Sequence, residues 1–145
     1  WCYWVAMDAP FGSNGNRWLL IYLNLAGESV FDGEGTCAAS SNLWALGNFS
    51  LFVRPGFKRV DLATKESKNF FGSAYISPDG RRLVAVYTNM SNKPVRLATT
   101  APGWENASVT TYTTSASKNL AGAPVAAGSQ VALDPQSVTT VVYDL

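Results

Sequence analysis

The chain has 145 residues, enough to bury a sizeable hydrophobic core. Its formal net charge is +1, and its basic residues form nothing larger than pairs such as Lys58-Arg59 and Arg81-Arg82, so nucleic-acid binding is not expected. Histidine is absent and no apolar run approaches the roughly 20 residues that cross a bilayer, which argues against histidine-dependent catalysis, histidine-ligated zinc and a membrane partner.

The first predicted element is a strand over Trp1 to Met7, which is rich in aromatic and β-branched residues. Strand alternation separates two faces: one carries Cys2, Trp4, Ala6 and Asp8, and the other carries Trp1, Tyr3, Val5 and Met7. Both faces are largely apolar, as in a parallel strand that is covered on both sides. The segment therefore indicates a strand of a larger parallel assembly.

The next elements are two loops and a second strand. Pro10 to Asn16 is dense in turn residues and predicts a loop. Trp18 to Asn24 predicts a strand. Gly27 to Ser41 is polar and glycine-rich, and we expect it to form a long loop that leads from strand to helix.

A short amphipathic helix is predicted within Leu43 to Phe57. Its start can be capped by Ser40, Ser41 or Asn42, whose side-chain oxygens can accept from the unpaired N–H groups of the first turn. Its end is predicted at Arg54-Pro55-Gly56, because proline lacks the N–H and disfavours helical angles in the residue before it. One apolar stripe recurs at helical spacing, formed by Leu43, Leu46, Phe49 and Phe52.

The rest of the chain follows an all-β pattern. Lys58 to Leu62 could form a linking strand, and further strands are predicted at Phe70–Ile76, Arg82–Thr88, Val95–Thr100, Ser108–Thr114, Gln130–Leu133 and Val138–Tyr143. Hairpin turns are predicted at Ser77–Gly80 and Ser91–Pro94. Alternating residues such as Leu83, Ala85 and Tyr87, or Val138, Thr140 and Val142, indicate one buried face per strand. Several short antiparallel strands at this spacing predict a β-sandwich.

The block ALGNFSLFVRPG, Ala45 to Gly56, resembles glycoside hydrolase family 30. Members of that family have a (β/α)8 barrel whose last helix carries a similar segment and then runs into a β-sandwich. The resemblance extends upstream to Trp1-Cys2-Tyr3-Trp4, which is similar to the eighth barrel strand. It implies a mainly β chain: residues 1–57 form the last β/α unit of a barrel and residues 58–145 a C-terminal antiparallel sandwich. A complete barrel needs roughly 250 residues, so the chain would be a piece of such an enzyme.

The resemblance also bears on catalysis. Retaining glycosidases use two carboxyl groups about 5 to 5.5 Å apart, one as acid/base and one as nucleophile. In the family these are glutamates at the ends of the fourth and seventh barrel strands, which would lie upstream of Trp1. None of the ten acidic residues present has a similar context. We therefore predict that this chain carries no catalytic residue of its own.

Three residues are predicted to bind substrate. Trp4 matches the tryptophan that lines the sugar subsite in the family's Trp-x-x-Trp strand; an indole packs well on the C–H face of a sugar, although core packing is the alternative. Asp8 lies on the same predicted face and could bond a sugar hydroxyl or cap the strand end. Trp104 lies in a predicted loop and could be a second sugar platform or cap a core edge.

Other polar residues carry weaker signals. Asp32 and Glu34 form a glycine-flanked acidic pair, which we interpret as a solvated turn or as a contact to a sugar hydroxyl. No metal or cofactor site is predicted, since Cys2 and Cys37 are too few and too far apart for zinc. These cysteines are expected at opposite barrel faces and hence unbonded to each other. Asn48, Asn89 and Asn106 match the N-glycosylation pattern, with Asn106 in a loop as the best acceptor and Asn48 a poor one.

Two functions follow as hypotheses. The leading one is a C-terminal piece of a secreted, retaining hydrolase of β-linked polysaccharide, which braces an upstream barrel of the same polypeptide and supplies part of the sugar site. By resemblance its substrate would be a β-1,6-galactan, a β-1,6-glucan or a xylan. The alternative is a stand-alone, non-catalytic carbohydrate-binding β-sandwich; a purely structural β domain is a third possibility.

Overall fold

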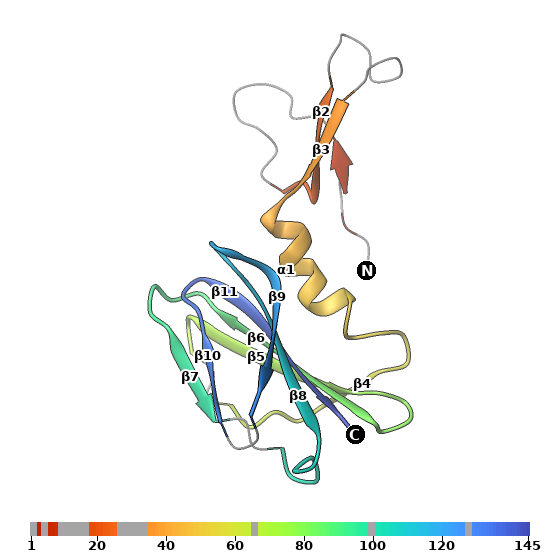
Figure 1. Cartoon of the computed structure of the whole chain (residues 1–145), viewed down its shortest axis with the longest axis vertical. Coiled ribbons are helices and arrows are strands. Elements are labelled where there is room, and N and C mark those ends of the chain that lie inside the picture. Colours follow the sequence, from red (N-terminus) through yellow and green to blue (C-terminus); the bar gives the residue numbers. More distant parts are fainter. Residues whose placement is uncertain are drawn as a thin grey trace. The chain divides into compact units, whose positions relative to one another are not determined.

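The computed structural model describes residues 3, 6–8, 18–25, 35–64, 67–98, 101–126 and 129–145. The chain divides into two compact units, Trp1–Trp44 and Ala45–Leu145, and helix α1, Ser41–Ser50, carries the chain from one into the other (Figure 1). Among these residues, no helix has the length and hydropathy needed to span a bilayer. The structure is mainly β, as the sequence predicts.

Three short strands lie in the described part of the first unit: β1, Met7–Asp8; β2, Ile21–Leu25; and β3, Gly35–Ala39. β1 is parallel to β2, with Met7 opposite Ile21, and β2 is antiparallel to β3. The predicted strand over Trp18 to Asn24 is confirmed by β2. Of the strand predicted over Trp1 to Met7, β1 includes Met7; Trp1, Cys2, Trp4 and Val5 lie outside the described residues.

The prediction of one long loop from Gly27 to Ser41 is wrong for its second half, because β3 occupies Gly35–Ala39. The five residues of β3 are small and are all exposed, so they show no alternation between apolar and polar positions. Backbone pairing with β2 makes this segment a strand, and that pairing is not visible in the sequence of the segment itself.

Helix α1 begins where the sequence predicts. Ser40 precedes it, and the Ser40 hydroxyl oxygen accepts from the N–H of Leu43 at 3.4 Å. The same hydroxyl donates to the carbonyl of Leu19 at 2.5 Å. The helix ends at Ser50, whose carbonyl accepts from the Arg54 guanidinium at 2.7 Å, shortly before Pro55 and before Gly56 at φ +91°.

The predicted apolar stripe is only half-buried, whereas the two fully buried helix residues are Gly47 and Asn48. A β-carbon on Gly47 would lie 2.6 Å from a methyl carbon of Leu120, so a larger residue there would require the Leu120 side chain to shift. Asn48 is 0% exposed; its side-chain amide donates to Thr114 Oγ1 at 2.8 Å, and Thr140 Oγ1 donates to Asn48 Oδ1 at 2.9 Å. A buried polar contact therefore seats this part of the helix on the sheet.

The second unit is an antiparallel sandwich, which confirms the predicted fold class. Its large sheet has six strands in the order β4-β5-β6-β11-β8-β9, and β10 pairs with β7 in a small sheet (Figure 1). The strands are β4 Lys58–Val60, β5 Phe70–Ile76, β6 Arg82–Asn89, β7 Val95–Ala98, β8 Ser108–Ser115, β9 Lys118–Val125, β10 Gln130–Leu133 and β11 Ser137–Asp144.

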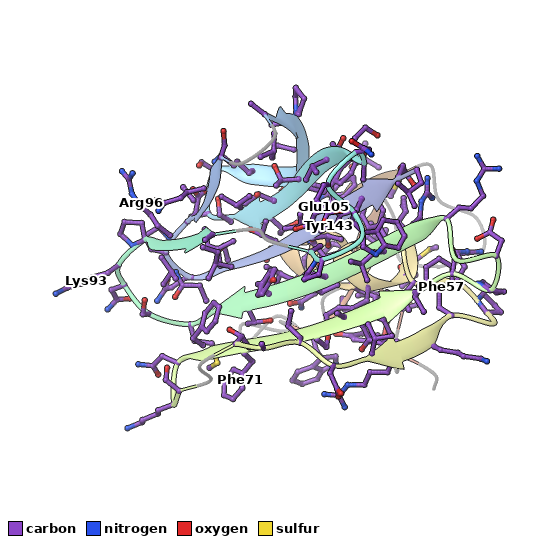
Figure 2. The ribbon with its side chains drawn as sticks, turned by 90° about the horizontal axis from the view of Figure 1, so that it is seen from below. Phe57, Phe71, Lys93, Arg96, Glu105 and Tyr143 are labelled. Atoms are coloured by element: carbon purple, nitrogen blue, oxygen red, sulfur yellow. The ribbon has the colours of Figure 1, made fainter. Side chains whose placement is uncertain are left out.

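The hydrophobic core lies between the two sheets. Its buried members are Phe70, Ala74, Ala85, Tyr87, Val131, Leu133, Val141 and Tyr143. Figure 2 shows Tyr143 inside the sandwich, whereas the Lys93 and Arg96 side chains project outward, away from the core. Burial raises the pKa of Tyr87 to about 12, since an ionised phenolate is strongly disfavoured there.

The prediction of one buried face per strand is wrong for β6 and β11. Val84 and Val86 on β6 are buried beside Thr140 and Val142 on β11, on the face turned away from the small sheet. The end of α1 and the residues after it cover this face, because Asn48 bonds Thr140 and the Phe52 and Tyr112 rings lie 4.5 Å apart. The central strands are therefore sandwiched between helix and sheet.

Two further predictions concern the connections. The turn at Ser77–Gly80 is confirmed: the Gly80 N–H donates to the Ser77 carbonyl at 3.0 Å, and Gly80 has φ +70°. The hairpin predicted at Ser91–Pro94 is wrong, because β6 pairs with β5 and β11 whereas β7 pairs with β10. That turn carries the chain from one sheet to the other.

Candidate functional site

Four acidic side chains of the second unit form bonds that hold its structure. Asp144 forms a two-point ion pair with Arg82, and Asp134 pairs with Lys118 at 2.8 Å. Asp79 accepts from the Ser77 hydroxyl, and Glu105 accepts from the Gly103 N–H at 2.9 Å. These carboxylates hold turns and strands together.

Their electrostatics also differ from those of a general acid. The Ser77 hydroxyl and the Arg81 N–H lower the pKa of Asp79, the Gly103 N–H lowers that of Glu105, and Lys118 lowers that of Asp134. A carboxyl group that donates a proton to a leaving group needs a raised pKa. None of these three carboxyl groups is therefore suited to that role, and no three potential metal ligands gather anywhere in the described parts of the chain.

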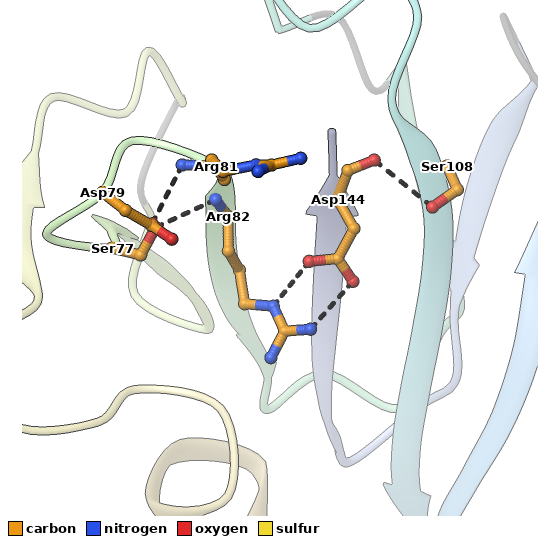
Figure 3. Close-up of polar contacts among 6 residues, drawn as sticks. All are labelled: Ser77, Asp79, Arg81, Arg82, Ser108 and Asp144. Atoms are coloured by element: carbon orange, nitrogen blue, oxygen red, sulfur yellow. Dashed lines mark hydrogen bonds and ion pairs between the residues drawn. The ribbon is translucent and has the colours of Figure 1, made fainter.

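The best-defined polar cluster lies where β5 and β11 end and β6 begins (Figure 3). Arg82 Nε and NH2 donate to the two Asp144 carboxylate oxygens at 2.6 and 3.0 Å, and the Asp144 carbonyl accepts from the Ser108 hydroxyl at 3.3 Å. The ion pair raises the pKa of Arg82. Both side chains are more than two-fifths exposed, so the pair links β6 to β11 without forming an enclosed site.

An open depression of about 600 Å³ lies beside this cluster; it is lined by Phe57, Ser77, Pro78, Asp79, Arg81, Arg82, Asp144 and Leu145. Four of its polar side chains bond one another: Ser77 bonds Asp79, and Arg82 bonds Asp144. These bonds hold the turn in place, and Arg81 is an exposed cation in the lining of the depression.

The predicted site residues fall in different places. Trp4 lies outside the described residues, as do Asp32 and Glu34. Asp8 is half-buried at the end of β1, opposite Tyr22 of β2. Cys37 is exposed in β3 and forms no disulfide with any part of the chain that the structure describes, which does not include Cys2.

Trp104 lies in a turn of the second unit. Its backbone N–H donates to the Ala101 carbonyl at 2.9 Å, and its backbone carbonyl accepts from the Ala107 N–H at 3.1 Å. The side chain is half-buried and packs against the sandwich core. The remaining exposed part of the ring is what a sugar could contact. Trp104 belongs to the second unit, whereas Asp8 belongs to the first.

Sequence reasoning gave no role to Trp18, which is 57% exposed immediately before β2. The hydroxyl of Tyr3 donates to the Trp18 carbonyl, and Tyr3 is itself 37% exposed. Each of these exposed aromatic rings is of a kind that packs on the C–H faces of sugar rings. Tyr3, Trp18 and Asp8 all belong to the first unit.

Comparisons with known proteins place this geometry in a family context. No family model and no curated protein sequence matches the chain. Among solved structures, it is similar to a glycoside hydrolase family 30 endoxylanase from Clostridium papyrosolvens, with 31% identity and a TM-score of 0.64. That match covers 74% of this chain and 28% of the xylanase.

Two further structures agree. A family 30 subfamily 8 xylanase from Clostridium acetobutylicum is 28% identical, with a TM-score of 0.63 over 74% of this chain and 29% of its own. A conserved exported protein from Bacteroides fragilis is 27% identical, with a TM-score of 0.72 over 86% of this chain and 26% of its own. The chain thus has a family 30-like fold and spans less than a third of the length of each of these proteins.

Proposed function

We propose that this chain is the C-terminal part of a retaining glycoside hydrolase of β-linked polysaccharide, in which it braces the catalytic barrel and supplies part of the sugar site. The observation that carries the proposal is the match to a family 30 endoxylanase at 31% identity over 74% of this chain but only 28% of the enzyme. The catalytic carboxylates would then lie in the remainder of the polypeptide. The acidic residues that hold turns and strands of the second unit, Asp79, Glu105, Asp134 and Asp144, are consistent with that division of labour.

The exposed surface of the first unit supports the bracing role. Met7 of β1 is 51% exposed, and Tyr3 and Trp18 are exposed nearby. A barrel needs parallel strands, and β1 and β2 are paired in parallel. In the proposed enzyme, neighbouring barrel strands cover Met7, while an aromatic surface remains open to substrate.

Within this proposal, Trp4 packs on a sugar ring and Asp8 bonds a sugar hydroxyl. Trp104 would form a separate contact with polysaccharide. Two of the similar proteins are xylanases, which favours xylan as substrate over β-1,6-galactan or β-1,6-glucan. Similarity to an exported protein supports secretion.

The test is hydrolysis by the full natural polypeptide on xylan, β-1,6-galactan and β-1,6-glucan, with the anomeric form of the first product followed by NMR. We expect cleavage of one of these polymers with retention of the β configuration. Inversion would overturn the retaining mechanism. Absence of cleavage on a wider panel of β-glycans, with polysaccharide binding retained, would favour the stand-alone binding module.

Single variants of the same polypeptide test the role of each site residue separately. Trp4→Ala should lower kcat/KM by about two- to tenfold, because a stacked aromatic contact is worth roughly 0.5–1.5 kcal/mol. Trp18→Ala should have a smaller effect and Trp104→Ala almost none on a soluble oligosaccharide. Equal activity in Trp4→Ala and wild type would remove Trp4 from the sugar site.

A further inference from the structure

The chain contains three Asn-x-Ser segments, and the structure separates them sharply. They begin at Asn48, Asn89 and Asn106. A sequon asparagine becomes glycosylated only where the glycan can extend into solvent. The relevant atom is the amide nitrogen Nδ2, to which the sugar is joined.

The first two asparagines use this atom inside the fold. Asn48 is 0% exposed, and its Nδ2 donates to Thr114 Oγ1 at 2.8 Å. Asn89 is 1% exposed, and its Nδ2 donates to the carbonyls of Lys93 and Asp134 at 2.9 and 2.8 Å. A glycan on either nitrogen would break these buried bonds and has no room.

Asn106 differs in every respect. It is exposed in the turn from Trp104 to Ala107, which is closed by the bond from the Ala107 N–H to the Trp104 carbonyl at 3.1 Å. Gly103 and Glu105 beside it are exposed as well. The sequon serine, Ser108, is exposed at the first position of β8. A bulky, solvated substituent at this turn would displace none of the core contacts.

We propose that Asn106 is an N-glycosylation site. In the modification, Asn106 Nδ2 bonds to the anomeric carbon of an oligosaccharide carried on a lipid diphosphate. The bond from that carbon to the diphosphate oxygen breaks, the lipid diphosphate leaves with the electron pair, and Nδ2 loses one proton. This proposal goes beyond the hydrolase function and requires only that the protein passes through a secretory pathway that contains the transferase.

The direct test uses the full polypeptide from its natural source. Peptide-N-glycosidase in heavy-oxygen water releases the glycan and converts the acceptor asparagine to an isotopically labelled aspartate, which peptide mass spectrometry locates. We expect label at Asn106 and none at Asn48 or Asn89. An unlabelled Asn106 peptide, or label at either buried asparagine, would overturn the proposal.

Variants secreted from a eukaryotic host provide matched controls. Asn106→Gln and Ser108→Ala should each lose the mass of one glycan, whereas Ser108→Thr, which preserves the sequon, should keep it. Ser50→Ala destroys the Asn48 sequon without touching the buried amide and should leave the mass of the glycan unchanged. Retention of the glycan in Asn106→Gln, or its loss in Ser50→Ala, would contradict the assignment.

Discussion

The two units of the chain differ in how completely their described residues bury apolar surface. In the second unit, β5, β6, β10 and β11 enclose a continuous core that includes Leu133 and Val141 at 0% exposure. In the described part of the first unit, Leu19 and Leu20 are the fully buried apolar residues, while Met7 and Trp18 are more than half exposed. Burial of apolar surface is the main source of stability, so the second unit can hold its fold by itself.

The comparison also separates structural from functional surface. In the described part of the second unit, two ion pairs, Arg82–Asp144 and Lys118–Asp134, link strands, and the buried Asn48 bonds Thr114 and Thr140. In the described part of the first unit, Tyr3 and Trp18 are exposed, and Asp8 is half-buried opposite Tyr22. Under the proposed function, the second unit braces the barrel. The first unit is the part whose exposed apolar residues are covered by neighbouring barrel strands and which contacts the substrate.

Amide hydrogen exchange should show the largest difference between the two units. We expect amides of β11, such as Thr139 to Val142, to exchange at least about a thousandfold more slowly than those of β3, because core strands open only by global unfolding. The measurement is exchange followed by NMR or mass spectrometry on the chain alone. Similar protection in the two strands would show that the first unit is as stable as the second.

Truncation of the sandwich core should give the next largest effect. Leu133→Ala removes a 0% exposed side chain from between the sheets and should cost about 3 kcal/mol of unfolding free energy. The matched control, Leu51→Ala, changes a leucine that is 57% exposed and should cost less than about 0.5 kcal/mol. Urea unfolding measures both. Equal losses would mean that the core assignment is wrong.

The buried helix contact should come next. Asn48→Ala leaves the Thr114 and Thr140 hydroxyls without their amide partner, and we expect a loss of about 2 kcal/mol. Ser50→Ala, two residues away and exposed, should change stability little. Near-wild-type stability of Asn48→Ala in urea would show that the apolar stripe, rather than Asn48, holds the helix.

The smallest expected effect is pH-dependent. Lys118 lowers the pKa of Asp134 in the folded state. The ionised Asp134 carboxylate therefore contributes to folding stability above the unfolded pKa near 3.8, and this contribution is lost as the pH falls through the lower folded value. Asp134→Asn should therefore be less stable than wild type at pH 7, by under about 1 kcal/mol, and equal to it at the lowest pH. A constant difference across that range would assign the effect to another cause.

How much of this fold can be predicted from sequence depends on whether a strand has a regular pattern of apolar residues. Phe70–Ile76 and Gln130–Leu133 have one, and their predicted bounds match β5 and β10. β9 was missed because Lys118–Val125 contains Gly122 and Pro124 and is mostly exposed; as an edge strand it takes its conformation from pairing with β8. Asn48 was missed because a polar residue beside an apolar stripe gives no sign that the tertiary structure buries it.

The candidate site is less readable than the fold. The sequence of its loop allows Trp104 to be a core cap or a sugar platform, and the structure shows that it packs on the core. Trp18 precedes a strand, where an aromatic residue is as often buried as exposed; its exposure depends on which strands surround it. Such residues are defined by tertiary contacts, which no local pattern encodes. The predicted division at residue 57 stays a prediction, while the second half of α1 packs within the sandwich unit.

The central claim, that this chain belongs to a barrel enzyme, is tested most directly by the intact mass of the polypeptide from its natural source. The account predicts a chain longer by a barrel, roughly 250 residues or more. A natural polypeptide that begins at Trp1 and ends at Leu145 would contradict it, and glycan binding by the isolated chain would then be the function to examine.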